Sequence, residues 1–232
     1  MQIFQWMNKH IIPRKFEKIR IGNNKDGGYV LPKKCVDESD LCISFGLGNN
    51  ITYEKDLLNR NKKVIGYDIA LKVRHPWARQ MKLDTYEEFS NISEVQQSNK
   101  IVLKIDTEGS EWNFFETMDM QHFGEKISCF AFELHLHMNP KKTPLSIMEK
   151  MFDTHYVAHV HGNNYGNCRE LVPVALEITL VNKKYFDNPP IDIQKYPIKN
   201  LDYANKPGRI ELDLPWLHSI KLLWLTFASI WR

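Results

Sequence analysis

The sequence predicts an α/β fold built on a doubly wound, mostly parallel β-sheet. Two observations carry this prediction. From residue 40 onward, apolar runs alternate with helical stretches along the chain. Several of these runs are continuously apolar, as expected of strands that are covered by helices on both faces. In sheets of this kind, ligands bind outside the carboxyl ends of the strands.

The individual elements follow from the apolar pattern in chain order. The predicted strands cover residues 41–45, 63–67, 101–105, 127–134, 156–160 and 176–181. A weaker strand signal lies at residues 80–84. The predicted helices cover residues 52–60, 111–118 and 143–152. Their alternation predicts right-handed crossovers between parallel strands.

Two segments flank this alternating region. The first forty residues contain Pro13, Pro32 and a turn at residues 23–28, so we expect an arm rather than a strand pair of the core. The region from 185 to 207 contains four prolines, which indicates an extended surface strap. We therefore divide the chain into an N-terminal arm (1–39), a catalytic domain (40–184), and a strap with an apolar C-terminal helix (185–232).

The composition argues against several classes of protein. The chain is 43% hydrophobic and 25% charged, which is typical of a soluble globular protein. A net charge of +3 without a dense Lys/Arg block argues against a nucleic-acid partner. The four cysteines lack Cys-x-x-Cys spacing, and the first residues lack the long apolar stretch of a secretory signal. We therefore expect a reduced, cytoplasmic protein.

The turn after the first predicted strand suits a nucleoside. Its two glycines let the backbone approach a ligand, and the following helix begins with free N–H groups. A dinucleotide motif needs a third glycine where this chain has Ile51, so we expect a nucleoside without a pyrophosphate, most commonly S-adenosylmethionine. Asp68 ends the second strand and can accept both ribose hydroxyls. The predicted nucleoside-binding residues are Gly46, Leu47, Gly48, Asn49, Asp68, Ile69 and, facing the adenine, Asp84.

Polar side chains follow the later strands at the same edge. Asp106 ends one strand, and Glu108 or Glu111 behind it could serve only to cap the next helix. Strand alternation places Glu133, His135 and His137 on one face of the next strand. The strand after that presents a similar set. It consists of His159, His161 and Asn163.

Two chemistries fit these groups. A histidine or glutamate with a pKa near neutral could take a proton from a substrate hydroxyl. Alternatively, Asp106, Glu133 and His161 could hold a divalent cation that acidifies this hydroxyl. The chain has no short-spaced motif such as His-Glu-x-x-His that would mark a metal site. The predicted catalytic residues are Asp106, Glu108, Glu133, His135 and His161.

Three motifs together resemble the FkbM-type methyltransferases. They are Arg20–Val30 with its Asp-Gly-Gly-Tyr core, Ser44–Asn50, and the Lys-Ile-Asp-Thr-Glu-Gly-Ser-Glu run of residues 104–111. The resemblance implies a class I, Rossmann-like fold that binds S-adenosylmethionine and transfers a methyl group, usually to oxygen. It also implies acceptors such as sugars, in O-methylation during carbohydrate biosynthesis.

The chain departs from the common methyltransferase pattern in its glycine turn. It has Ser44 and Asn50 where an acid and a third glycine are usual. We therefore expect the methionine end of the cofactor to be contacted by the arm around Asp26 to Tyr29, and by Asp106.

Other functions remain open at this stage. A nicotinamide-dependent oxidoreductase uses the same βαβ plan, although Ile51 and the absence of a Tyr-x-x-x-Lys pair argue against it. A non-enzymatic binding module is a third possibility. The apolar tail of residues 216–232 contains three tryptophans, which suits a membrane surface, a partner subunit, or packing onto its own domain. The expected substrate is a small hydroxylated molecule.

Overall fold

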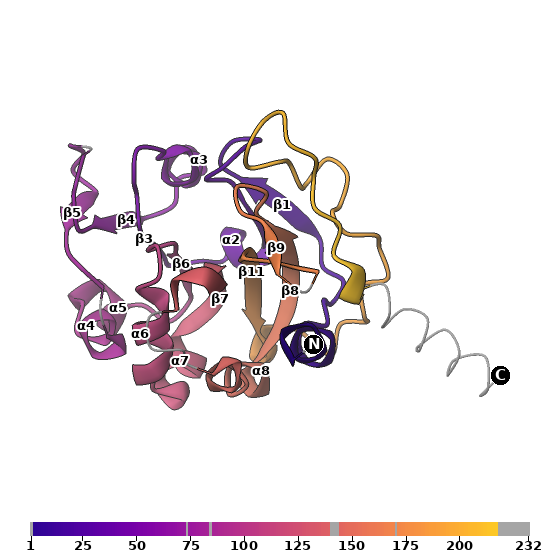
Figure 1. Ribbon diagram of the computed structural model, residues 1–232. Coiled ribbons are helices and arrows are strands. Elements are labelled where there is room, and N and C mark those ends of the chain that lie inside the picture. Colours follow the sequence, from indigo (N-terminus) through magenta and orange to yellow (C-terminus); the bar gives the residue numbers. More distant parts are fainter. Residues whose placement is uncertain (1, 73, 84, 140–143, 170, 218–232) are drawn as a thin grey trace.

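A seven-stranded sheet forms the centre of the computed structural model (Figure 1), which describes residues 2–72, 74–83, 85–139, 144–169 and 171–217. The strand order is β5-β4-β3-β6-β7-β11-β8. β11 is antiparallel to both of its neighbours, and the other neighbouring strands are parallel. The predicted mostly parallel α/β sheet is thereby confirmed.

The elements agree with the prediction in most places. The strands are β1 (Lys18–Ile21), β2 (Tyr29–Pro32), β3 (Leu41–Phe45), β4 (Val64–Asp68), β5 (Ala78–Gln80), β6 (Ile101–Ile105), β7 (Ile127–His135), β8 (His155–Gly162), β9 (Cys168–Arg169), β10 (Val172–Pro173) and β11 (Ala175–Asn182). The helices are α1 (Gln2–His10), α2 (Lys33–Asp37), α3 (Thr52–Asn59), α4 (Tyr86–Ser90), α5 (Ser93–Gln97), α6 (Glu111–Thr117), α7 (Met120–Lys126) and α8 (Met151–Thr154). Short 3₁₀ helices are η1 (Leu136–Met138), η2 (Leu145–Met148) and η3 (Lys183–Tyr185).

Two predicted elements differ from the structure. The helix expected at 143–152 is replaced by η2 and α8, joined by bonds between residues three apart, such as Phe152 N to Glu149 O at 3.0 Å. Met148 and Met151 are both buried, and their spacing of three matches the tighter 3₁₀ period. The strand expected at 80–84 is β5, which ends at Gln80 and is largely exposed, so it carries little apolar signal.

Side chains of the sheet pack into two layers. On one face the strands contact α1 and the helices α4 to α7, through a cluster rich in phenylalanine. On the other face they contact β1, β2, α2 and α3, and the strand residues there are small, including Cys129 and Ala131. Toward the strand ends this second face becomes polar. The buried polar residues on it include Ser44, Lys104, Glu133, Glu177 and His161.

The first forty residues are more than an arm. β1 and β2 form an antiparallel hairpin, and every residue of β2 is buried. The turn at 23–28 joins these two strands, so the expectation that the segment lies outside the core is wrong. The hairpin packs on the small side chains of the sheet, and Thr179 Oγ1 in β11 donates to Val30 O at 2.8 Å. This packing carries the hairpin turn to the polar edge.

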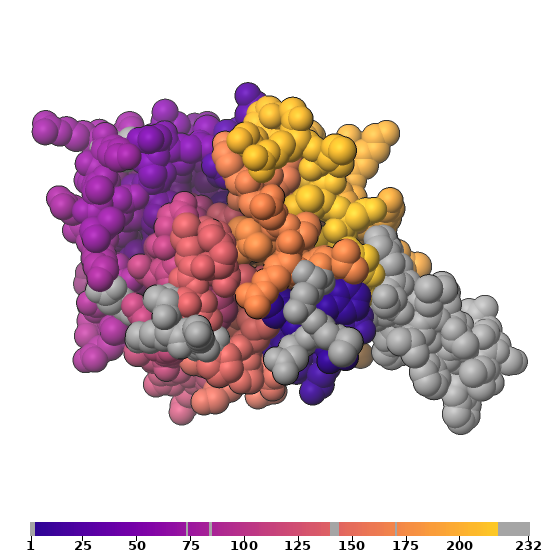
Figure 2. Space-filling view, viewed as in Figure 1, coloured from indigo at the N-terminus to yellow at the C-terminus, as the bar shows by residue number. Residues whose placement is uncertain are grey.

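The segment after β11 returns to the hairpin. Lys18 Nζ and Asp192 Oδ2 lie 2.8 Å apart with both side chains buried, and Arg20 donates to Leu201 O at 2.9 Å. Figure 1 shows this segment, in yellow, beside β1 and the orange β8 and β9, and Figure 2 shows it against the orange surface. Trp216 and Leu217 are buried in the core, so the predicted tail begins inside it. Its remainder, 218–232, lies outside the described residues. Among the described residues, no helix is long and apolar enough to cross a membrane.

Candidate active site

The glycine turn after β3 is in direct contact with the end of β6. Gly46 has a φ of +83°, and a Cβ at this position would lie 1.6 Å from the carbonyl oxygen of Asp106. Only glycine fits there, because both the backbone conformation and the close approach exclude a side chain. Gly48 also has a positive φ, of +55°, but a Cβ there would meet no atom within 4 Å. The turn is therefore closed on the β6 side and open on the other.

Asp68 at the end of β4 is bonded to this turn. Its Oδ2 accepts from Leu47 N and from Gly48 N, each at 2.9 Å. Its Oδ1 accepts from Ala70 N at 2.8 Å. A carboxylate accepts about four hydrogen bonds, so these leave room for one further donor rather than two. The carboxylate both shapes the turn and faces the ligand space.

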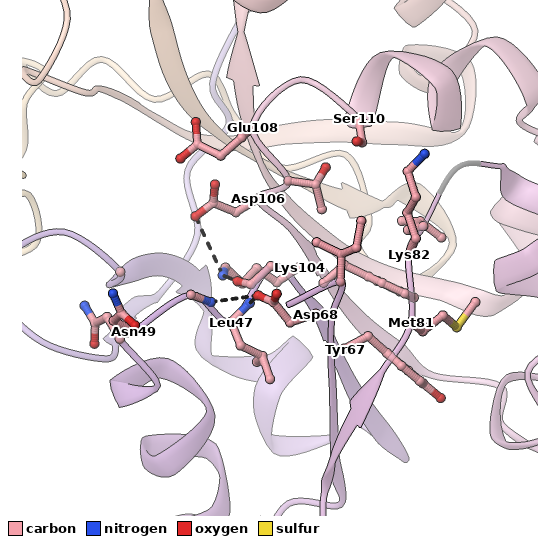
Figure 3. A pocket seen from close by; sticks show the side chains of 18 of the residues that line it. Leu47, Asn49, Tyr67, Asp68, Met81, Lys82, Lys104, Asp106, Glu108 and Ser110 are labelled. Carbon is pink, nitrogen blue, oxygen red and sulfur yellow. Dashed lines mark hydrogen bonds and ion pairs between the residues drawn. The ribbon is translucent and has the colours of Figure 1, made fainter. Parts of the chain in front are cut away.

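A cavity of about 330 Å³ opens above the turn (Figure 3). Its volume is in the usual range for small-molecule sites. The predicted nucleoside-binding residues line it, apart from Asp84, which lies outside the described residues. The cavity lining consists of Asp26, Gly27, Phe45, Gly46, Leu47, Gly48, Asn49, Asn50, Tyr67, Asp68, Ile69, Met81, Lys82, Leu83, Lys104, Asp106, Thr107, Glu108 and Ser110. Tyr67, Met81 and Leu83 give the part near β4 and β5 an apolar wall.

Two buried residues, Tyr29 and Lys104, contact the carboxylate of Asp106. The Tyr29 hydroxyl donates to Asp106 Oδ2 at 2.9 Å, and Lys104 Nζ lies 3.7 Å from the same oxygen. Burial, followed by the Asp106 charge, raises the pKa of Tyr29 well above its usual value, so the phenol keeps its proton and remains a donor. Tyr29 therefore reaches the site through Asp106 and does not itself line the cavity.

A second cavity of about 470 Å³ adjoins the first. The two share three lining residues, Asp26, Asp106 and Glu108. Glu108 has a φ of +51°, a conformation that is costly for glutamate and is concentrated at functional sites. The remaining residues of the second cavity are Glu133, His135, His137, Asn163, Tyr165, Gly166 and Ala175.

His135 is surrounded by carboxylates. Its Nδ1 lies 3.0 Å from Glu111 Oε1, and its Nε2 lies 3.4 Å from Glu108 and 3.6 Å from Glu133. Burial alone would lower the pKa of His135, but the Glu111 hydrogen bond and the charges of Glu133, Glu111 and Asp106 outweigh it and raise the pKa to about 9. At neutral pH His135 is therefore an imidazolium.

Glu133 lies beside this imidazolium in the second cavity. Its Oε1 accepts from Asn163 Nδ2 at 2.5 Å, and its cross-strand neighbour in β11 is Glu177. Burial, then the charge of Asp106, raises the pKa of Glu133 well above its usual value. The site thus contains a carboxyl group that holds its proton more tightly than an ordinary glutamate does.

The structure does not bring His161 to either cavity. Its Nδ1 lies 3.0 Å from Glu177 and its Nε2 lies 2.8 Å from Glu211, so both ring nitrogens are occupied. His159 Nε2 is similarly paired with Asp202, at 2.7 Å. Strand alternation gave the correct face for these side chains, but long-range partners decide what they contact. His161 therefore cannot join Asp106 and Glu133 as a metal ligand without breaking one of its pairs.

A different group has the spacing of a metal site. One ligand atom each from Asp106, Glu108 and His135 lies within 4.8 Å of the others. The His135 atom that faces this group is Nε2, because Nδ1 is bonded to Glu111. Such a ligand must be deprotonated, and the imidazolium must lose its proton first. The donor set would suit a divalent ion only in that state.

Several residues of the site were not in the predicted set. Glu111 fixes the turn after β6, accepting from Gly109 N at 2.9 Å as well as from His135. Asn163 orients Glu133. Asp26, which was expected in the arm near the methionine end of the cofactor, comes from the hairpin turn and lines both cavities. The sequence did contain a signal for Lys104. A charged residue within a buried strand is rare unless it is paired, so its position in an apolar run could have indicated a site residue.

Comparisons with known proteins give weak likenesses. No protein-family model matches the chain, and no curated protein sequence matches it. Among solved structures, fibrillarin, a pre-rRNA processing protein of Methanococcus jannaschii, aligns with a TM-score of 0.38 and 9% identity, over 63% of this chain and 68% of that one. A Streptococcus mutans protein described as a methyltransferase, in complex with SAH, aligns with a TM-score of 0.33 and 10% identity, over 64% and 93%. Identities and TM-scores this low assign no activity to this chain.

Proposed function

We propose that this chain is an S-adenosylmethionine-dependent methyltransferase that methylates a hydroxyl oxygen of a small acceptor. The observation that carries the proposal is the pair of adjoining cavities, which share a wall formed by Asp26, Asp106 and Glu108. The first cavity has the glycine turn and the strand-end acid that suit a nucleoside. A group transferred between two ligands has to cross the place where their cavities meet.

The lining of the first cavity favours one orientation of the cofactor. Tyr67, Met81 and Leu83 provide an apolar wall for an adenine, and Asp68 can accept from the ribose. The methionine end would then extend toward Asp106 and the second cavity. When bound there, the cofactor supplies an electrophilic methyl group on a sulfonium sulfur. The residues of the chain orient the acceptor oxygen and remove its proton.

The second cavity favours a hydroxylated acceptor. Four carboxylates line it, from Asp26, Asp106, Glu108 and Glu133, and no lysine or arginine is among the lining residues that the structure describes. Carboxylates accept hydrogen bonds from hydroxyl groups and repel phosphate. Tyr165, which is 52% exposed, offers an aromatic face to a ring. The acceptor is therefore an uncharged polyol at its methylated end, and the resemblance to FkbM-type enzymes makes a sugar of a surface glycan the first choice.

Glu133 is the proposed base. As the new O–CH₃ bond forms and the S–CH₃ bond breaks, the hydroxyl proton passes to the Glu133 carboxylate. Its raised pKa suits this role, because the carboxylate then has a higher affinity for the hydroxyl proton than an ordinary glutamate has. The neighbouring His135 imidazolium stabilises the negatively charged forms of Glu133 and Glu108. We assign His135 this charge-balancing role in place of the base role expected from the sequence.

A metal-dependent variant of the same reaction uses the group Asp106, Glu108 and His135. Activity measured after strong chelation, with and without added Mg²⁺ or Mn²⁺, separates the two versions. Full activity after chelation supports proton transfer to Glu133 alone. Activity that is lost and then restored by one ion supports the metal version.

Calorimetry with S-adenosylhomocysteine and with NAD tests the function. The proposal expects micromolar or tighter binding of S-adenosylhomocysteine and no saturable binding of NAD. Tight binding of NAD would instead support the oxidoreductase. Retention of S-adenosylhomocysteine without methylation of any hydroxylated acceptor would favour a binding module.

A further inference from the structure

Lys104 is a buried cation within the apolar strand β6. It is 3% exposed, and its ammonium donates to Gly46 O at 2.8 Å. Its nearest carboxylate oxygen, Asp106 Oδ2, lies 3.7 Å away, beyond hydrogen-bond distance. The ammonium also lies 5.4 Å from the centre of the Tyr29 ring. Figure 3 shows it between Asp106 and the glycine turn.

The ammonium has bonding capacity left over. It carries three N–H donors, and one of them is used by Gly46. A buried charge is costly unless it is paired and hydrogen-bonded, and a single carboxylate at 3.7 Å satisfies this only in part. Lys104 lines the first cavity, so a ligand there can reach the ammonium.

The charges of the cavity divide along its length. Lys82 follows Met81 at the apolar wall near β5, whereas Lys104 lies with Asp106 at the boundary with the second cavity. The boundary therefore offers a cation and an anion side by side. The complementary ligand group carries an ammonium and a carboxylate on the same carbon, which is an α-amino acid.

We propose that Lys104 and Asp106 bind the amino-acid end of the cofactor, with Lys104 on its carboxylate and Asp106 on its ammonium. This inference rests on the proposed function, and it assigns a residue to each charge of that end. A salt bridge to an ordered, buried ammonium costs little extra ordering, because the Gly46 carbonyl already holds Lys104 in place.

Three ligands isolate this interaction. S-adenosylhomocysteine has the whole amino-acid end, its decarboxylated analogue keeps only the ammonium, and 5′-methylthioadenosine lacks both. For the parent protein, the decarboxylated analogue should bind about 10- to 100-fold more weakly than S-adenosylhomocysteine, as expected for loss of a charged hydrogen bond. This comparison needs no variant, so it does not depend on the folding of one.

The variant Lys104→Met removes the other partner of the same interaction, so that protein and ligand changes together form a thermodynamic cycle. The variant should lose the same factor for S-adenosylhomocysteine, bind 5′-methylthioadenosine within about threefold of the parent, and no longer distinguish S-adenosylhomocysteine from its decarboxylated analogue. Lys55→Met, at an exposed position in α3, is the matched control, and it should retain the parent's preference for S-adenosylhomocysteine over that analogue.

The outcomes separate the two proposals. Equal weakening of S-adenosylhomocysteine and 5′-methylthioadenosine in Lys104→Met would show that Lys104 only supports the glycine turn. Parent protein that binds the decarboxylated analogue as tightly as S-adenosylhomocysteine would also overturn the inference. Parent protein that binds none of the three ligands would overturn the proposed function itself.

Discussion

Tyr29 and Asp106 are 77 residues apart in the chain, and the Tyr29 hydroxyl donates to Asp106 Oδ2 at 2.9 Å. The bond joins the N-terminal hairpin to the carboxyl end of β6. Because Asp106 lines both cavities, the hairpin supports a residue that the proposed reaction would use. Removal of this hydrogen bond should therefore lower turnover in a protein that still folds.

Tyr29→Phe deletes only this hydroxyl. We expect kcat to fall by about tenfold. A hydrogen bond to a charged group contributes about 1.5–3 kcal/mol, and only the part that orients Asp106 for the reaction affects kcat. The affinity for S-adenosylhomocysteine should stay within about twofold of the parent. Steady-state kinetics and calorimetry on the same preparation check both values. An unchanged kcat would mean that Asp106 needs no support from the hairpin.

Two glycine substitutions should have different effects. Gly46→Ala places a methyl group against the Asp106 carbonyl and should prevent folding or lower stability by several kcal/mol. Gly48→Ala has free space and only the cost of its positive φ, about 1–2 kcal/mol. It should fold and bind S-adenosylhomocysteine less tightly, because the methyl group enters the cavity. Thermal melting of both variants, with and without ligand, is the measurement.

Asp68→Asn keeps the shape of the side chain but removes its charge. One ribose hydroxyl and the Leu47 and Gly48 N–H groups would lose a charged acceptor, so the affinity for S-adenosylhomocysteine should fall by about 10- to 100-fold. Asp187→Asn, a change at an exposed position far along the chain, is the control and should bind like the parent. Equal affinities in the two variants would remove Asp68 from the nucleoside site.

The pH dependence of kcat/KM should be bell-shaped. The rate rises with pH as Glu133 loses the proton that its raised pKa retains. It falls above about pH 9, where His135 loses its charge. His135→Gln should remove the alkaline limb, and Glu133→Gln should abolish most activity. A profile in which the alkaline limb survives in His135→Gln would assign that limb to another group.

His161 should make stability depend on pH. Burial alone would lower its pKa, but Glu177 and Glu211 raise the pKa to about 10, from 6.5 in the unfolded chain. A raised folded-state pKa gives stability that is complete below pH 6.5 and is lost as pH rises through about 10. Denaturant titrations between pH 6 and 10 should show this loss. The loss should shrink in His161→Gln, whereas His122→Gln, at a partly exposed site, should behave like the parent.

Local patterns predicted the sheet and the edge at which the site lies. The rule that ligands bind at strand ends placed Asp68, Asp106, Glu133 and His135 on the two cavities, because parallel strands all end at one edge. The same rule failed for His161. Alternation fixes the face on which a strand residue lies. It does not show that Nε2 of His161 pairs with the carboxylate of Glu211, 50 residues away in the chain.

The hairpin was missed for a related reason. β1 and β2 are four residues long and flanked by turn residues, so their sequence indicates a loop. Their burial comes from small side chains on distant strands, such as Cys129 and Ala131, which no window along the chain reveals. Tertiary packing of this hairpin therefore explains how Asp26 comes to line both cavities.

The contact between Gly46 and Asp106 has a consequence for how this site can change over evolution. The Gly46 carbonyl is bonded to Lys104, its N–H to Tyr67, and its Cα leaves no room beside the Asp106 carbonyl. The half of the site that faces the glycine turn is thus a single rigid block, in which a change at one residue disturbs all the others. Under the proposed function, the acceptor would contact the opposite side, where Tyr165 and Gly166 line the second cavity without contacting the glycine turn. Relatives with different acceptors should therefore differ near Tyr165 while keeping the turn unchanged.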